Sequence, residues 1–171
     1  MMMSPASTRV SEMHDATVRL IKPEDLAEWL KLRRRMWPRT PEHRQIEEAS
    51  SILGQSDVSP VFVADVGREL AGFVEVSMRD HVEGCETGPV GYIEGWYVEP
   101  EYRGRGIGRA LMQEAEGWAA GHRCREMASD AALSNQRGRR LHAQLGYEET
   151  ERRIVFRKRL DAPIHTLRAS P

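Results

Sequence analysis

The chain has 171 residues, of which 30% are charged and 40% are hydrophobic, and its formal net charge is −1. This length suits a single domain with one core, and the near-zero net charge argues against binding to nucleic acid or to an anionic membrane. The arginine clusters at residues 33–35 and 137–140 are therefore expected on solvated helix faces. No apolar run suits a signal peptide or a membrane span, which favours a cytoplasmic location.

Residues 1–15 are polar and without periodicity, so we expect a flexible N-terminal extension. The segments that follow show the apolar periodicities of strands and helices. Strands are expected over residues 17–21, 61–66 and 70–79, and helices over residues 23–37 and 41–53. The last two of these strands are joined by a short glycine-containing turn and should form an antiparallel pair.

Residues 80–90 form a turn-rich loop with three acids, Asp80, Glu83 and Glu86. Such a loop is commonly just solvated. It directly precedes the strand with the best catalytic candidate, however, so it can instead form the wall of a site for a polycation. Cys85 lies in the same loop, far from Cys124 and in no C-x-x-C motif, so neither a zinc or other metal site nor a redox motif is indicated.

A strand expected over residues 91–98 contains Glu94 in an otherwise aromatic and apolar run. Strict alternation assigns to one face of this strand Tyr92, Glu94, Trp96 and Val98. A carboxylate there needs a partner, so Glu94 either forms a structural salt bridge or binds and deprotonates an ammonium group. Gly95 weakens the strand and indicates a bulge or the close approach of a bound molecule.

The strand leads into an R-x-x-G-x-G turn over residues 103–108, and then into an amphipathic helix. Glycines leave backbone N–H groups free where the helix begins, and this arrangement binds anions such as phosphate. Gly108 is followed by Arg109 and Ala110, which excludes a Walker loop. The spacing of the glycines also differs from that of the dinucleotide fingerprint.

A further strand is expected over residues 124–129, with Asp130 just past its carboxyl end, where open α/β sheets have their sites. Asp130 and Asn135 are also plausible as plain helix caps, and Asn135 begins the next helix. We expect the chain to close with a β pair over residues 147–160 and a tail over residues 161–171.

The motif V-x-P-E-Y-R-G-R-G-I-G resembles the acetyl-CoA motif of the Gcn5-related N-acetyltransferases (GNAT). PVGYIEGWYV, ASDAAL and LGYEETER resemble the aminoglycoside 6'-N-acetyltransferases within that family, and the similarity covers residues 18–160. The resemblance implies an α/β (α+β) fold with a mixed, mostly antiparallel sheet flanked by helices, in a single domain over residues 16–160. It also implies a homodimer that acetylates the 6'-amine of aminoglycosides with acetyl-CoA, thereby conferring resistance.

The resemblance also assigns roles to residues at matching positions. Catalytic base chemistry is implied for Asp130 and Glu94. Substrate binding is implied for Trp37, His81, Glu94, Asp130 and Glu151. Acetyl-CoA binding is implied for Trp96, Tyr97, Val98, Arg103, Gly104, Arg105, Gly106, Ile107, Gly108, Arg109 and Asn135.

Some of these positions have a second interpretation. From the sequence alone, Trp37 is as well explained as a core aromatic and Glu151 as an exposed strand acid. His81 stands where close relatives carry tyrosine. His142 stands four residues before Gly146, where many members of the family carry the tyrosine that protonates the departing thiolate. His142 is therefore a substitute candidate for the general acid.

Neither cysteine has a recognisable base beside it, so we expect direct transfer in a ternary complex rather than an acyl-enzyme. The acceptor is either an aminoglycoside or, as the alternative, a peptide N-terminus, a lysine or a polyamine. A CoA-binding regulatory module without turnover is a further alternative. No nucleic-acid or membrane partner is expected.

Overall fold

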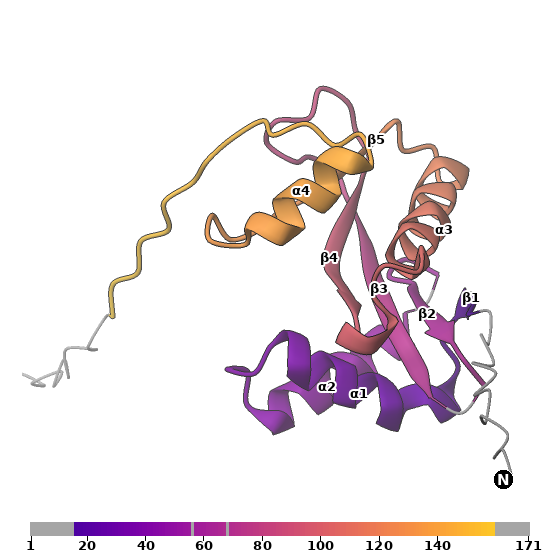
Figure 1. Cartoon of the computed structure of the whole chain (residues 1–171). Coiled ribbons are helices and arrows are strands. Elements are labelled where there is room, and N and C mark those ends of the chain that lie inside the picture. Colours follow the sequence, from indigo (N-terminus) through magenta and orange to yellow (C-terminus); the bar gives the residue numbers. More distant parts are fainter. Residues whose placement is uncertain (1–15, 56, 68, 160–171) are drawn as a thin grey trace, which may run out of the picture.

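The computed structural model describes residues 16–55, 57–67 and 69–159, which form a five-stranded sheet covered by helices (Figure 1). The strands lie in sequence order: β1 (Thr17–Leu20), β2 (Val61–Asp65), β3 (Leu70–Arg79), β4 (Val90–Val98) and β5 (Glu126–Ser129). The first three junctions are antiparallel, and β4 pairs with β5 in parallel. The predicted mixed, mostly antiparallel sheet is therefore confirmed.

Helices cover both faces of the sheet (Figure 1). They are α1 (Leu26–Met36), α2 (Glu42–Leu53), α3 (Ile107–Gly121) and α4 (Gln136–Gln144), with 3-10 turns η1 (Pro23–Asp25) and η2 (Pro100–Tyr102). Phe62 and Ala64 of β2 pack with α3, whereas Val61 and Val63 pack with α1 and α2. Because both faces are buried, the central strands are nearly continuous apolar runs.

Strand β4 does not follow the strict alternation expected of it. Glu75 of β3 pairs with Gly95, but the next residue, Val76, pairs with Ile93, so Glu94 is an extra residue in a bulge. The bulge that Gly95 indicated is thus confirmed, and the predicted faces hold for residues 95–98 but are wrong for residues 92–94. Beyond the bulge, Ile93 rather than Tyr92 shares the α3 face with Trp96.

The β pair predicted over residues 147–160 is also wrong over its described part. Residues 147–159 form no strand, and three successive apolar side chains there, Ile154, Val155 and Phe156, are 80%, 89% and 88% exposed. In Figure 1 this segment runs from α4 away from the sheet. An alternating sequence forms a strand only where a backbone edge is available to pair with it.

The predicted N-terminal extension (1–15) and C-terminal tail (161–171) lie outside the described residues, so both stay predictions. The predicted domain bounds likewise stay predictions. Among the residues that are described, no helix is long and apolar enough to cross a membrane.

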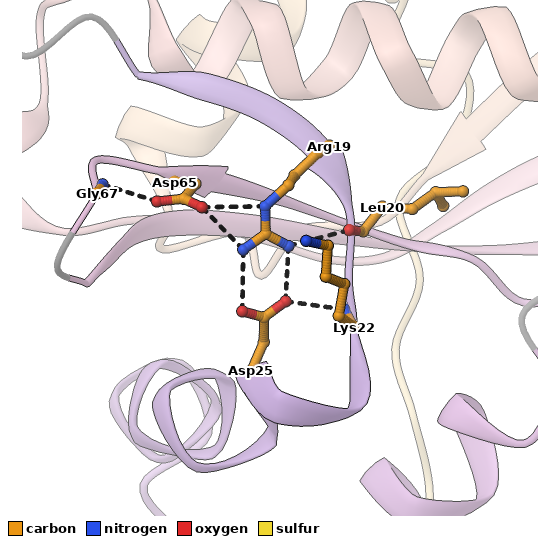
Figure 2. Close-up of polar contacts among 6 residues, drawn as sticks. All are labelled: Arg19, Leu20, Lys22, Asp25, Asp65 and Gly67. Atoms are coloured by element: carbon orange, nitrogen blue, oxygen red, sulfur yellow. Dashed lines mark hydrogen bonds and ion pairs between the residues drawn. The ribbon is translucent and has the colours of Figure 1, made fainter.

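Arg19 of β1 joins three parts of the fold through its guanidinium (Figure 2). It donates to both carboxylate oxygens of Asp25 in η1, at 2.7 and 2.9 Å, and to Asp65 at the end of β2, at 2.8 and 3.0 Å. These bonds lower the pKa of Asp25 below its usual value, because the ionised form accepts them. The pKa of Asp65 is also lowered, first by the backbone N–H of Gly67 and then by Arg19.

We expect Arg19→Met to lower the free energy of unfolding near neutral pH by about 1–3 kcal/mol, because two carboxylates lose a charged donor. Both have folded-state pKa values below 3.8, so this stabilisation is present above that pH and is lost as the pH falls through those values. Urea unfolding of both proteins near neutral pH and at about pH 3 measures the effect. An equally large difference at both pH values would contradict this explanation.

Candidate active site

The glycine-rich turn lies between η2 and α3. Gly104 and Gly106 have φ angles of +78° and +82°, a left-handed conformation that side chains make costly. Arg103 donates from Nε to the carbonyl of Val98, 2.7 Å away, and thereby ties the turn to the end of β4. No described side chain caps the N-terminus of α3. Its first N–H groups are therefore available to an anion such as a pyrophosphate.

Beside this turn, strand β4 has an open edge. The pairing of β4 with β5 runs from Val90 opposite Glu126 to Ile93 opposite Ser129, and in the described residues it does not continue. Apart from the carbonyl of Val98, which accepts from Arg103, the backbone of residues 94–98 on that edge is therefore free for an extended ligand with amide groups. The turn and the edge together fit the phosphates and the two amides of a CoA molecule.

Helix α4 borders the open edge of β4. Asn135, the residue directly before this helix, accepts a hydrogen bond from the backbone N–H of Gly138 at 2.9 Å, so the helix cap that the sequence allowed is present. His142 contacts the ring of Trp96 edge-on, with centroids 5.5 Å apart. Its Nδ1 lies 2.8 Å from the carbonyl of Gly138, while Nε2 is buried and has no partner among the described residues. A carbonyl only accepts, so Nδ1 is the donor and Nε2 of the neutral ring is an acceptor.

A cavity of about 480 Å³ lies between α1, α2 and the strands β3 and β4. Trp37, the residue directly after α1, forms part of the cavity wall and also packs against Phe73 with ring centroids 6.1 Å apart. A Cβ atom at Gly95 would lie 2.5 Å from the Trp37 ring, so only glycine allows this contact. Trp37 is thus both a core aromatic and a wall of the cavity.

An ion pair at the base of this cavity was not foreseen from the sequence. Arg33, expected on a solvated face, is buried and donates to Glu75 at 2.5 Å and to Glu48 at 3.0 Å. Its guanidinium also lies over the rings of Trp29 and Trp37. Burial raises the pKa of Glu75 to about 7, although the positive charge of Arg33 acts to lower it. The sequence contains one signal of this pair, because Glu75 is a lone acid within the apolar run of β3.

The two acids predicted to be catalytic are linked through side chains of β3 and β4. Glu94 accepts from Ser77 at 2.5 Å and from Arg79 at 2.8 and 3.0 Å, so the salt bridge that the sequence allowed is present. The guanidinium carbon of Arg79 lies 3.4 Å from the ring centroid of Tyr92. The Tyr92 hydroxyl donates to Asp130 at 2.6 Å. Burial first, and then this bond, raise the pKa of Tyr92 to about 12, so it stays protonated.

Of the predicted substrate residues, only Trp37 and Glu94 line the cavity, whereas Asp130, His81 and Glu151 do not. His81 is exposed in the loop after β3, and Glu151 is exposed in the segment after α4, where it accepts from Arg153 at 3.3 Å. Arg153 also forms an ion pair with Glu83, which joins this segment to the acidic loop. Within the described part of the chain, no group of three His, Cys, Asp or Glu residues is arranged to hold a metal ion.

The fold and this site together define a class of protein. Residues 24–147 match the model of the acetyltransferase (GNAT) family, and the chain belongs to this family. An aminoglycoside N(6')-acetyltransferase type 1 of Stenotrophomonas maltophilia is 38% identical over 146 residues, which cover 85% of this chain and 94% of the relative. A protein of the same name from Salmonella enteritidis is 37% identical, covering 83% of this chain and 98% of its own.

A solved structure shows similarity to the same kind of protein. AAC(6')-Iy in complex with the bisubstrate analogue CoA-S-monomethyl-acetylneamine is 36% identical, with a TM-score of 0.79, and the match covers 85% of this chain and 99% of that one. The predicted GNAT fold is therefore confirmed.

Proposed function

We propose that this protein transfers the acetyl group of acetyl-CoA to the 6'-amine of aminoglycoside antibiotics. One observation about β4 carries the proposal. The open backbone edge of this strand lies beside the glycine turn, and Glu94, the acid in its bulge, lines the cavity. A thioester bound along the edge would end beside an amine held in the cavity. The names of the relatives support an aminoglycoside as the acceptor.

On the donor side, backbone N–H groups of the glycine turn would hold the pyrophosphate of acetyl-CoA. The open edge of β4 would pair with the amides of pantetheine. The residues assigned to this half of the site are Trp96, Tyr97, Val98, Arg103, Gly104, Arg105, Gly106, Ile107, Gly108, Arg109 and Asn135. Arg103 acts here through its bond to Val98, whereas Arg105 and Arg109 are exposed and free to meet phosphates.

On the acceptor side, carboxylates would bind the ammonium groups of the aminoglycoside. The residues assigned to this half of the site are Trp37, His81, Glu94, Asp130 and Glu151. Trp37 offers a ring face to a sugar. Charge-assisted hydrogen bonds are worth roughly 1.5–3 kcal/mol each, so several of them would select a polycationic substrate. His81 and Glu151 would reach the acceptor from the acidic loop and from the segment after α4.

An amine is mostly protonated at neutral pH, so it has to lose a proton before it attacks a thioester. We assign this step to Glu94 or Asp130, acting directly or through a water. Backbone N–H groups on the open edge of β4 would stabilise the oxyanion that forms. His142 is the candidate that protonates the leaving thiolate, and it can do so from Nε2 only as the imidazolium, because Nδ1 is bound to Gly138.

The transfer is direct rather than through an acetylated cysteine. Burial raises the pKa of the thiols of Cys85 and Cys124, which makes both poorer nucleophiles near neutral pH. Acetylation removes the positive charge of the 6'-amine, so the reaction would inactivate the antibiotic for a target that binds that charge. We place this reaction in the cytoplasm, where acetyl-CoA is made, and expect it to confer resistance.

We further propose a homodimer. The segment after α4 carries the exposed Ile154, Val155 and Phe156 between basic residues, and a second copy of the chain would give this alternating run a backbone partner. The family resemblance favours the same assembly.

The activity is tested by thiol release from acetyl-CoA with kanamycin, tobramycin and amikacin, beside spermidine and a short peptide. We expect turnover on the aminoglycosides with a free 6'-amine and none on a 6'-hydroxyl analogue. Turnover confined to the peptide or to spermidine would overturn the acceptor. CoA binding without turnover on any amine would indicate a regulatory module instead.

The acceptor-side role of Asp130 is tested by Asp130→Asn, which keeps the shape and an acceptor for Tyr92. We expect kcat/KM for kanamycin to fall at least about 10-fold, because a charge-assisted bond is lost, while the KM of acetyl-CoA stays within about twofold. The exposed Asp57 provides a control, since Asp57→Asn should change neither value. Equal losses on both substrates would count against an acceptor-side role.

The dimer is tested by Phe156→Glu, which places a charge in the exposed apolar run. We expect sedimentation equilibrium to give twice the mass of one chain for the wild type and a single-chain mass for the variant, since a buried unpaired charge is costly. Val58 is also exposed, at 50%, and Val58→Glu is the matched control that should remain dimeric. A single-chain mass for the wild type would refute the dimer.

A further inference from the structure

Arg79 has an unusual position relative to the predicted catalytic acids. It is the last residue of β3, and its NH2 nitrogen lies 2.8 and 3.0 Å from the two carboxylate oxygens of Glu94. Its guanidinium covers the ring of Tyr92, whose hydroxyl donates to Asp130. A positive charge of the protein itself is therefore paired with one of the two carboxylates expected to receive the ammonium groups of the acceptor, and it lies over the ring whose hydroxyl is bonded to the other.

We propose that Arg79 is a resident cation that occupies the acceptor site in the free enzyme and is displaced from Glu94 by an ammonium group of the aminoglycoside. This inference rests on the proposed function and adds a residue that determines specificity. Glu94 is neutralised by a cation before and after the exchange, so its charge is never left without a partner. Ser77 remains bonded to the carboxylate of Glu94 throughout.

The surroundings of Arg79 allow this exchange. The side chains of Arg79 and Glu94 are 42% and 39% exposed, and an ion pair so open to water and salt adds little stability. The second arginine near the cavity differs in this respect. Arg33 and Glu75 are only 4% and 5% exposed, and displacement of Arg33 would leave the buried carboxyl of Glu75 without its charged partner. Arg33 is therefore a fixed part of the fold, and Arg79 is the cation that can move.

The exchange favours acceptors with several positive charges. Arg79 is held on the same chain as Glu94, so its effective concentration there is high and a ligand with one ammonium group competes poorly. A polycation gains further contacts with the remaining carboxylates and can displace the guanidinium. Arg79 thus discriminates against small monoamines without contacting the acetyl donor.

The test compares steady-state kinetics of the wild type, Arg79→Met and Arg79→Lys with kanamycin and with a simple monoamine. If Arg79 is a displaced competitor, Arg79→Met should lower the KM for kanamycin at least about threefold and should lower the KM for the monoamine by a larger factor. Arg79→Lys keeps a cation and should stay close to the wild type. An unchanged or raised KM for kanamycin in Arg79→Met would overturn the proposal, because it would mean that Arg79 is neutral or helps to position Glu94.

Arg139→Met is the matched control. Arg139 forms an ion pair with Glu149 at 2.7 Å, and the two side chains are 39% and 46% exposed, close to the values for Arg79 and Glu94. The control should leave both KM values unchanged. Absence of any aminoglycoside turnover by the wild type would refute the proposed function itself, whereas turnover with no fall in KM in Arg79→Met would refute only the displacement.

A second measurement follows Arg79 in the wild-type enzyme itself and needs a variant only to assign its signal. In wild-type enzyme labelled with 15N-arginine, the Nε signal of Arg79 is identified by its loss in Arg79→Lys. Titration with kanamycin in the presence of CoA should shift this signal towards that of a freely solvated arginine. An Arg79 signal that keeps its position at saturation would show that the ion pair persists and would overturn the proposal.

Discussion

The extra residue at Glu94 in strand β4 is the constraint on which both halves of the site depend. In a regular strand Glu94 would share the α3 face with Trp96, against the apolar cluster there. The bulge turns Glu94 towards the cavity beside α1 and α2, and the pairing of β4 with β5 ends one residue earlier, at Ile93. The bulge thus provides the acid of the acceptor site, and it lies next to the open edge of β4 that would bind acetyl-CoA.

The glycine after the bulge determines how near α1 can lie. A side chain at Gly95 would overlap the ring of Trp37, so the end of α1 approaches β4 only because no Cβ is present there. Trp37 in turn lies against the guanidinium of Arg33, which is bonded to Glu75 on β3. The wall of the cavity and the buried ion pair are therefore one packed unit, so this side of the acceptor site is as rigid as the core.

Each acid of the site has a partner, and the depth of burial decides what the partner can do. Glu75 is enclosed with Arg33, so that pair stabilises the fold only while it is complete. Glu94 and Arg79 are open to solvent, and their pairing can be exchanged for a ligand at little cost. Asp130 is bonded to a neutral phenol, so its charge remains available to a cation. Similar residues thus have different roles.

The sequence by itself determined the strands and helices up to α4 and the glycine turn, because periodicity, proline and glycine act over a few residues. Gly104 and Gly106 were readable because only glycine adopts a positive φ without strain. Only the tertiary structure decided what depends on distant partners. Arg33 and Glu75 are 42 residues apart, and the alternation near Phe156 could not specify an edge to pair with. Burial and pairing are set by the whole chain, and local sequence does not encode them.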